Sequence, residues 1–199
     1  MRRALTMADR PRYYVSLGDT GSADDNGDNR ADDLLYQNQD EAFPEWAGRD
    51  LSTRVPAARL LSLTVEGAAS AGVRYSQLPR LADLGISPDL ITIHLGANDL
   101  LPCFGDEEAL RNATEAFVVN IGVILRQARR AAVVRAPVLI NAMPIYEGDA
   151  TAAWALRSNK ALREIAAEAR VIVVDLPVPS AGASIREAWW NTLAKIGFV

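Results

Sequence analysis

The residues best suited to chemistry follow an apolar run near the N-terminus. Residues 13–17, Tyr-Tyr-Val-Ser-Leu, are typical of a buried strand, and Gly18 then allows a sharp turn. Asp19 and Thr20 should therefore lie at the carboxyl end of that strand, the edge at which open α/β sheets bind ligands. A threonine hydroxyl is a nucleophile when a base lies beside it. A carboxylate such as Asp19 can transfer a proton or hold the turn by hydrogen bonds.

Two further groups of candidate residues follow the second and third apolar runs of the chain. Gly67 lets a substrate approach bare backbone, and the side-chain amide of Asn98 is a neutral hydrogen-bond donor. Because the carboxyl ends of parallel strands meet at one edge, we expect both residues to converge with Thr20 around a single point. Glu66 and Asp99 are expected to contact substrate, as acids or bases if burial raises their pKa. Asp99 also suits a hydrogen bond that holds its turn.

The acidic segment after the first strand supplies two more candidates. Residues 22–33 have neither a helical nor a strand period, so they are predicted to form a surface loop. Ser22 could replace Thr20 as nucleophile, and Asp24 could contact substrate or transfer a proton. An ordinary role as loop residues remains open for both.

The rest of the chain alternates apolar strands with amphipathic helices. The strands are expected at residues 13–17, 59–65, 90–95, 138–140 and 171–174. The helices are expected at residues 77–84, 106–128, 152–169 and 185–196, with Asp106 as an N-cap. This alternation predicts an α/β fold, a three-layer α/β/α sandwich with a mainly parallel five-stranded sheet. A single domain is expected over residues 1–199.

Composition narrows the possible partners. The chain has 199 residues, a net charge of −4 and one cysteine. Scattered arginines and a negative charge argue against nucleic acid, and no apolar run is long enough for a signal peptide or a membrane span. We expect a cytoplasmic protein that acts on a small molecule, with no cofactor and no metal ion. Trp189 and Trp190 are adjacent on a predicted helix and point about 100° apart, so at least one is expected to pack against the sheet and the other is a candidate for an exposed contact surface. A homo-oligomer is a further possibility.

Three of these strand ends together resemble a known family. Gly18-Asp19-Thr20, the lone Gly67 and Gly96-Ala97-Asn98-Asp99 occur in the order and at the strand ends seen in SGNH, or GDSL, hydrolases. The resemblance covers roughly the first two-thirds of the chain. It implies an SGNH-hydrolase, flavodoxin-like fold and a substrate with a carbonyl or ester group.

The resemblance also implies roles for individual residues. It implies a serine nucleophile at position 20, and an oxyanion hole made by the backbone N–H groups of residue 20 and Gly67 and by the amide of Asn98. The family's base comes from a C-terminal Asp-x-x-His. Here position 20 is threonine, and no histidine follows Asp175. Either the Asp-x-x-His block has been lost, which makes the catalytic triad degenerate, or it lies beyond Val199.

The only histidine, His94, precedes Asn98 by four residues on a predicted strand. At about 3.3 Å per residue it is expected on the order of 10 Å below the active edge, in a buried structural role rather than a catalytic one. Three hypotheses follow. The favoured one is an enzyme repurposed for cyclisation, isomerisation or elimination of a small carbonyl compound. The second is an esterase or acyl transferase with Thr20 as nucleophile, whose histidine comes from residues beyond Val199 or from a partner. The third is a pseudoenzyme that only binds a ligand or a protein.

Overall fold

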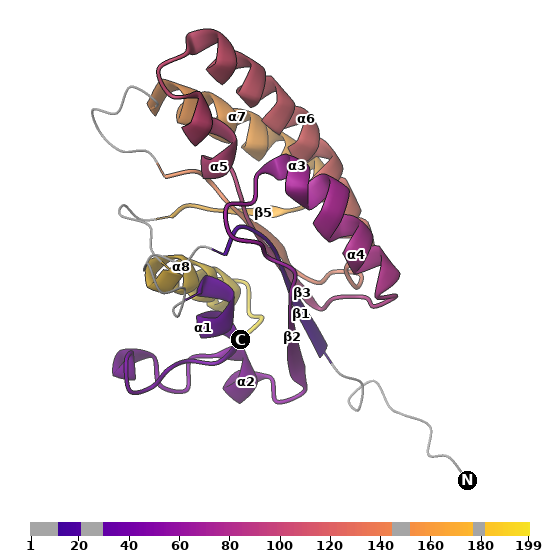
Figure 1. Cartoon of the computed structure of the whole chain (residues 1–199). Coiled ribbons are helices and arrows are strands. Elements are labelled where there is room, and N and C mark those ends of the chain that lie inside the picture. The colour runs from indigo at the N-terminus through magenta and orange to yellow at the C-terminus, as the bar shows by residue number, and fades with distance from the viewer. Residues whose placement is uncertain (1–11, 21–29, 145–151, 177–181) are drawn as a thin grey trace.

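Five parallel strands form the centre of the molecule (Figure 1). The computed structural model describes residues 12–20, 30–144, 152–176 and 182–199. The strands are β1 (Arg12–Gly18), β2 (Ala58–Ser62), β3 (Leu90–His94), β4 (Val138–Asn141) and β5 (Ile172–Val174). Their order is β2-β1-β3-β4-β5, and every neighbouring pair is parallel. The predicted α/β class and five-stranded parallel sheet are confirmed.

Helices cover both faces of this sheet, as expected for a three-layer sandwich (Figure 1). One face carries α3 (Ser70–Gly72), α4 (Leu78–Asp83), α6 (Glu107–Ala131) and α7 (Ala152–Ala169). The other face carries α1 (Ala31–Tyr36), α2 (Leu51–Arg54) and α8 (Gly182–Lys195). The short helix α5 (Ala97–Leu100) follows β3 at its carboxyl end. Within the described ranges, no helix combines the length and the apolar character that crossing a membrane requires.

Alternate side chains of β1 enter two different cores. Val15 and Leu17 pack in the cluster that includes Ile121 of α6. Tyr14 packs in the cluster that includes Trp189 of α8. A strand buried on both faces explains why residues 13–17 read as a nearly continuous apolar run. Each large apolar side chain buried in this way contributes about 1.5–3 kcal/mol.

The second strand and the helix after it differ from the sequence prediction. β2 ends at Ser62 rather than at residue 65, although the N–H of Leu63 and of Val65 still donate to carbonyls of β1. The helix predicted at residues 77–84 is α4, and a wide π-helical turn at Val73–Gln77 separates it from α3. Such turns often lie at functional sites, and this one brings Gln77 against β1.

The predicted surface loop at residues 22–33 is wrong at its C-terminal end. α1 begins at Ala31, and Asp32 is only 1% exposed. The cause is a set of hydrogen bonds that Asp32 receives from strand residues, described below. Trp189 and Trp190 are both buried, so neither forms the exposed contact surface considered from the sequence.

Candidate active site

Gly18 ends β1 in a turn that only glycine can occupy. Its φ is +101°, and a Cβ at this position would lie 1.9 Å from the carbonyl oxygen of His94. The side chain of Gln77 clamps the same peptide, since its Oε1 accepts from the N–H of Gly18 at 2.7 Å and its Nε2 donates to the carbonyl at 3.0 Å. The N–H of Asp19 then donates to the carbonyl of His94 at 2.8 Å. The turn that carries Asp19 is therefore fixed on both sides.

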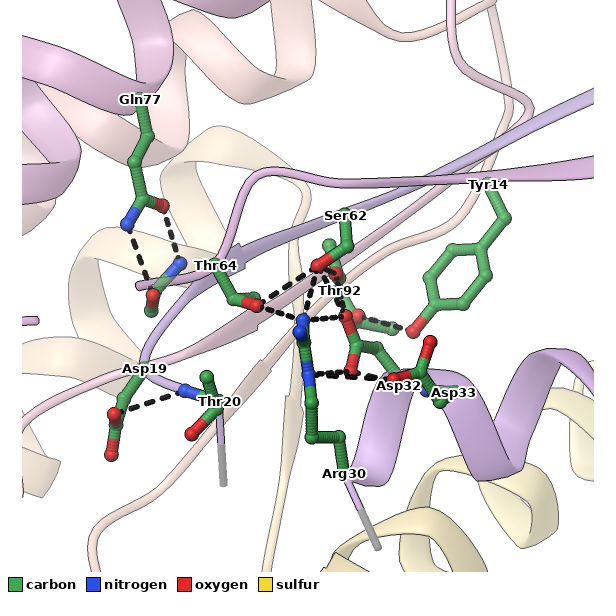
Figure 2. A network of polar contacts seen from close by, with 12 residues as sticks. Tyr14, Asp19, Thr20, Arg30, Asp32, Asp33, Ser62, Thr64, Gln77 and Thr92 are labelled. Atoms are coloured by element: carbon green, nitrogen blue, oxygen red, sulfur yellow. Dashed lines mark hydrogen bonds and ion pairs between the residues drawn. The ribbon is translucent and has the colours of Figure 1, made fainter. Parts of the chain in front are cut away.

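This turn directs two backbone N–H groups at one oxygen atom. The N–H of Thr20 donates to Oδ1 of Asp19 at 2.9 Å, a contact drawn in Figure 2. The N–H of Gly67, from the loop after β2, donates to the same Oδ1 at 2.8 Å. The structure therefore brings these two candidate donors together, and the carboxylate of Asp19 occupies the position at which both N–H groups point.

Gly67 presents its backbone to open space. Its φ is +72°, a left-handed conformation that favours glycine, and an added Cβ would have nothing within 4 Å. Both Gly67 and the neighbouring Glu66 are exposed. A ligand can therefore approach this peptide from solvent.

Asn98 and Asp99 reach the same edge from α5 but make different contacts. The side-chain amide of Asn98 donates to the carbonyl of Ala68 at 3.4 Å, so it lies beside the Gly67 loop. Asp99 instead accepts from the N–H of Ser70 at 3.0 Å and from its hydroxyl, which ties α5 to α3. Burial raises the pKa of Asp99, although its hydrogen bonds with Ser70 oppose the shift. The contacts of Asp99 match the turn-holding role considered from the sequence.

The expected position of His94 is wrong. His94 is the last residue of β3 and pairs in register with Gly18, so it lies at the active edge rather than about 10 Å below it. The reason is that β3 ends at His94, four residues before Asn98, and the chain then turns into α5. Its Nδ1 has no hydrogen-bond partner among the described residues. Burial lowers the pKa of His94, and the charge of Asp19 opposes this shift.

A partly buried polar network that the sequence did not predict lies near this edge (Figure 2). Asp32 accepts hydrogen bonds from the hydroxyls of Ser16 and Ser62. It also pairs with the guanidinium of Arg30 at 3.0 Å. Arg30 in turn donates to the hydroxyls of Ser62 and Thr64. The network joins β1, the end of β2 and the start of α1. It therefore fixes the position of Arg30 and of the first turn of α1 against the sheet.

The charge of Asp32 acts on its neighbours. The hydroxyl of Tyr14 is hydrogen-bonded to Thr92 at 2.9 Å. Burial is the main reason why the pKa of Tyr14 is raised, and the negative charge of Asp32 raises it further. Burial and Asp32 also raise the pKa of Asp33. The sequence held one signal for this network, namely polar Ser16 and Thr92 within otherwise apolar strands.

Two candidate residues, Ser22 and Asp24, lie outside the described residues. In the described part of the chain, His, Cys, Asp and Glu side chains nowhere gather in a group of three or more that could hold a metal ion.

The fold and the edge define a class of protein. The order β2-β1-β3-β4-β5 is the flavodoxin-like doubly wound arrangement, whose ligand site lies where the order reverses, between β1 and β3. Gly18 and His94 lie at that reversal. Residues 18–195 match the model of the GDSL-like lipase/acylhydrolase family. The chain belongs to this family, as the resemblance of its motifs implied.

Solved structures of a hydrolase and of two esterases share the fold at low sequence identity. LAE5, an alpha/beta hydrolase enzyme from the metagenome of Lake Arreo, Spain, is 16% identical with a TM-score of 0.61, over 97% of this chain and 99% of that one. Axe2, an acetylxylan esterase from Geobacillus stearothermophilus, is 14% identical with a TM-score of 0.60, over 96% of each chain. The acetyl xylan esterase AlAXEase is 13% identical with a TM-score of 0.56, over 93% of this chain and 83% of its own. No curated protein sequence matches the chain.

Proposed function

We propose that this GDSL-family protein is an enzyme that converts a small carbonyl- or ester-containing metabolite without hydrolysis, by cyclisation, isomerisation or elimination. The observation that carries the proposal is the pair of N–H groups, from Thr20 and Gly67, that meet at Oδ1 of Asp19. A substrate oxygen that displaced this carboxylate oxygen would accept the same two hydrogen bonds. Each donor aimed in this way is worth about 3–4 kcal/mol when negative charge develops on that oxygen.

The displaced carboxylate of Asp19 then has a chemical role. It would lie beside the bound carbonyl, where a carboxylate base can remove a proton from the neighbouring carbon. The enolate oxygen that results would remain between the two N–H groups, and the amide of Asn98 is the third candidate donor near them. Proton transfer at carbon, followed by shift of a double bond or loss of a leaving group, is isomerisation or elimination.

Two features support a reaction other than serine-type hydrolysis. Threonine at position 20 has an extra methyl group that stiffens χ1 and crowds the approach to a carbonyl. From Asp175 to Val199 the given sequence has no histidine and therefore no Asp-x-x-His. Asp175 itself is exposed and forms an ion pair with Arg163 of α7. Loss of the nucleophile or base of such a triad costs up to about a millionfold in turnover.

A second candidate function is ester hydrolysis or acyl transfer with Thr20 as nucleophile. The position of His94 favours it, because the residue lies in register with Gly18 and its Nδ1 has no hydrogen-bond partner in the described part of the chain. A histidine there is a candidate base for the hydroxyl of Thr20.

An activated-ester assay separates these two functions. We expect the wild type, Thr20→Ala and Thr20→Ser to release p-nitrophenol from p-nitrophenyl acetate equally slowly, since the proposed reaction does not use the threonine hydroxyl. Activity that is lost in Thr20→Ala and in His94→Gln, and raised in Thr20→Ser, would contradict the proposal and support the esterase.

Mass spectrometry of a metabolite extract then tests for catalysis. The wild type should convert a metabolite to an isomer or to an elimination product. The two products of a hydrolase would instead have a combined mass that exceeds the mass of the substrate by one water. Asp19→Asn should abolish the conversion because the base is lost, and Asn98→Ala should slow it. Glu107→Gln, an exposed change in the first turn of α6, is the matched control. An extract left unchanged by the wild type would favour the binding protein over the enzyme.

A further inference from the structure

A pocket rich in arginine lies at the amino ends of β4 and β5. Its volume is about 890 Å³, and Arg129, Arg130, Arg135 and Arg170 are among the thirteen residues that line it. None of the thirteen is acidic, although the whole chain carries a net charge of −4. Because all strands are parallel, this pocket lies at the sheet edge opposite Asp19, and it is independent of the proposed reaction.

Three of these arginines have no ion-pair partner among the described residues. Arg129 donates to the carbonyls of Val133 and Ala136, so its guanidinium holds the loop between α6 and β4. Arg130, Arg135 and Arg170 are exposed, and their side chains form no ion pair or hydrogen bond with any residue that the structure describes. Their guanidinium groups are therefore available to a ligand.

The backbone at two of these arginines is strained. Arg135 has a φ of 68° and Arg170 a φ of 56°, and they are the only non-glycine residues with positive φ among those described. Each lies within the connection from a helix to a strand, where glycine or asparagine adopts this conformation at less cost. The loops themselves do not require arginine at either position. Side chains kept at strained positions point to a role outside folding.

The rest of the pocket is apolar. Ile172, Ile196 and Phe198 form part of its lining, and Val134 at its rim is 86% exposed. A volume in this range suits a small organic ligand. We propose that this pocket binds a small molecule that carries a phosphate group next to an apolar portion. Guanidinium groups bind phosphate through paired hydrogen bonds, and a dianion balances more of the charge of three arginines than a carboxylate does.

Isothermal titration with simple probes tests the ligand class on the intact protein. Naphthyl phosphate should bind, whereas naphthoate and inorganic phosphate should each bind about tenfold or more weakly, because one lacks the dianion and the other lacks the apolar portion. Equal affinity for naphthyl phosphate and inorganic phosphate would overturn the proposal. So would the absence of naphthyl phosphate binding.

Glycine substitutions separate binding from folding. The double variant Arg135→Gly/Arg170→Gly should bind naphthyl phosphate about tenfold more weakly or worse, while its Tm stays the same or rises because glycine relieves the backbone strain. Arg111→Gln, at the other end of α6, is the matched control and should bind as the wild type does. Unchanged affinity in the double variant, or an equal loss in Arg111→Gln, would overturn the site.

Discussion

At the scale of single residues, one carboxylate oxygen controls the candidate site. Oδ1 of Asp19 accepts the N–H groups of both Thr20 and Gly67, so any carbonyl ligand must displace it to reach them. His94 lies at the same edge, and its carbonyl fixes the N–H of Asp19. The backbone of Asp19 is thus held by the neighbouring strand β3, whose last residue, His94, carries the second ionisable side chain of this edge.

His94 predicts how stability depends on pH. Burial lowers its pKa below 6.5 in the folded state, so the unfolded chain binds a proton more readily than the folded one. The contribution of neutral His94 to the free energy of unfolding is therefore complete above pH 6.5. It is lost as the pH falls from 6.5 towards the pKa of His94 in the folded state. The charge of Asp19 moderates the loss.

Thermal unfolding between pH 7.5 and 5.5 tests this prediction. As the chain has one histidine, His94→Gln should flatten the pH dependence of Tm in this interval. In a chain of this size, a loss of about 1 kcal/mol lowers Tm by about 2–4 °C. Identical slopes for the two proteins would show that His94 is not responsible.

At the scale of elements, the ends of helices and one buried arginine position the helices against the sheet. α8 carries Arg186, which is fully buried between the rings of Trp46 and Trp190 and donates to the carbonyl of Arg49. Burial, more than the charge of Arg49, lowers the pKa of Arg186 to about 10. These contacts fasten the segment before α2 to α8.

The start of α6 gives a prediction at this scale. Asp106 accepts from the N–H groups of Glu108 and Ala109, each at 3.0 Å, as its predicted role of N-cap requires. Asp106→Ala should lower the free energy of unfolding by about 1 kcal/mol, and Asp106→Asn should keep most of it because asparagine is as good a cap. Urea unfolding of the three proteins measures the difference, and equal losses for both variants would contradict the capping role.

At the scale of the whole molecule, one sheet joins two cores and two edges. The carboxyl edge carries Asp19 and Gly67, and the opposite edge carries the arginine pocket. Helices on either face pack on the same strands, with Leu125 of α6 in one core and Leu193 of α8 in the other. A change in either layer should therefore destabilise the whole sheet.

Urea unfolding of two core variants tests this coupling. Leu125→Ala and Leu193→Ala remove side chains that are 0% exposed, so each should cost about 2–5 kcal/mol. Trp46, Trp189 and Trp190 all lie on the α8 side, so tryptophan fluorescence reports mainly on that layer. For Leu125→Ala the fluorescence and far-UV circular dichroism midpoints should nevertheless coincide. Separate midpoints would show that the layers unfold independently.

The sequence by itself determined the features that depend on neighbouring residues. The Gly18 turn, the N-cap at Asp106 and the alternation of strands and helices follow from local backbone preference and hydrophobic period. These features were enough to predict the parallel sheet and to place Thr20, Gly67 and Asn98 at one edge.

Only the tertiary structure decided which distant groups meet there. Gln77 clamps a peptide 59 residues earlier, and Asp32 is buried because hydroxyls from β1 and β2 surround it. The register of β3 against β1 places His94 beside Gly18. Such contacts depend on how separate strands and helices pair, and no local pattern encodes that pairing.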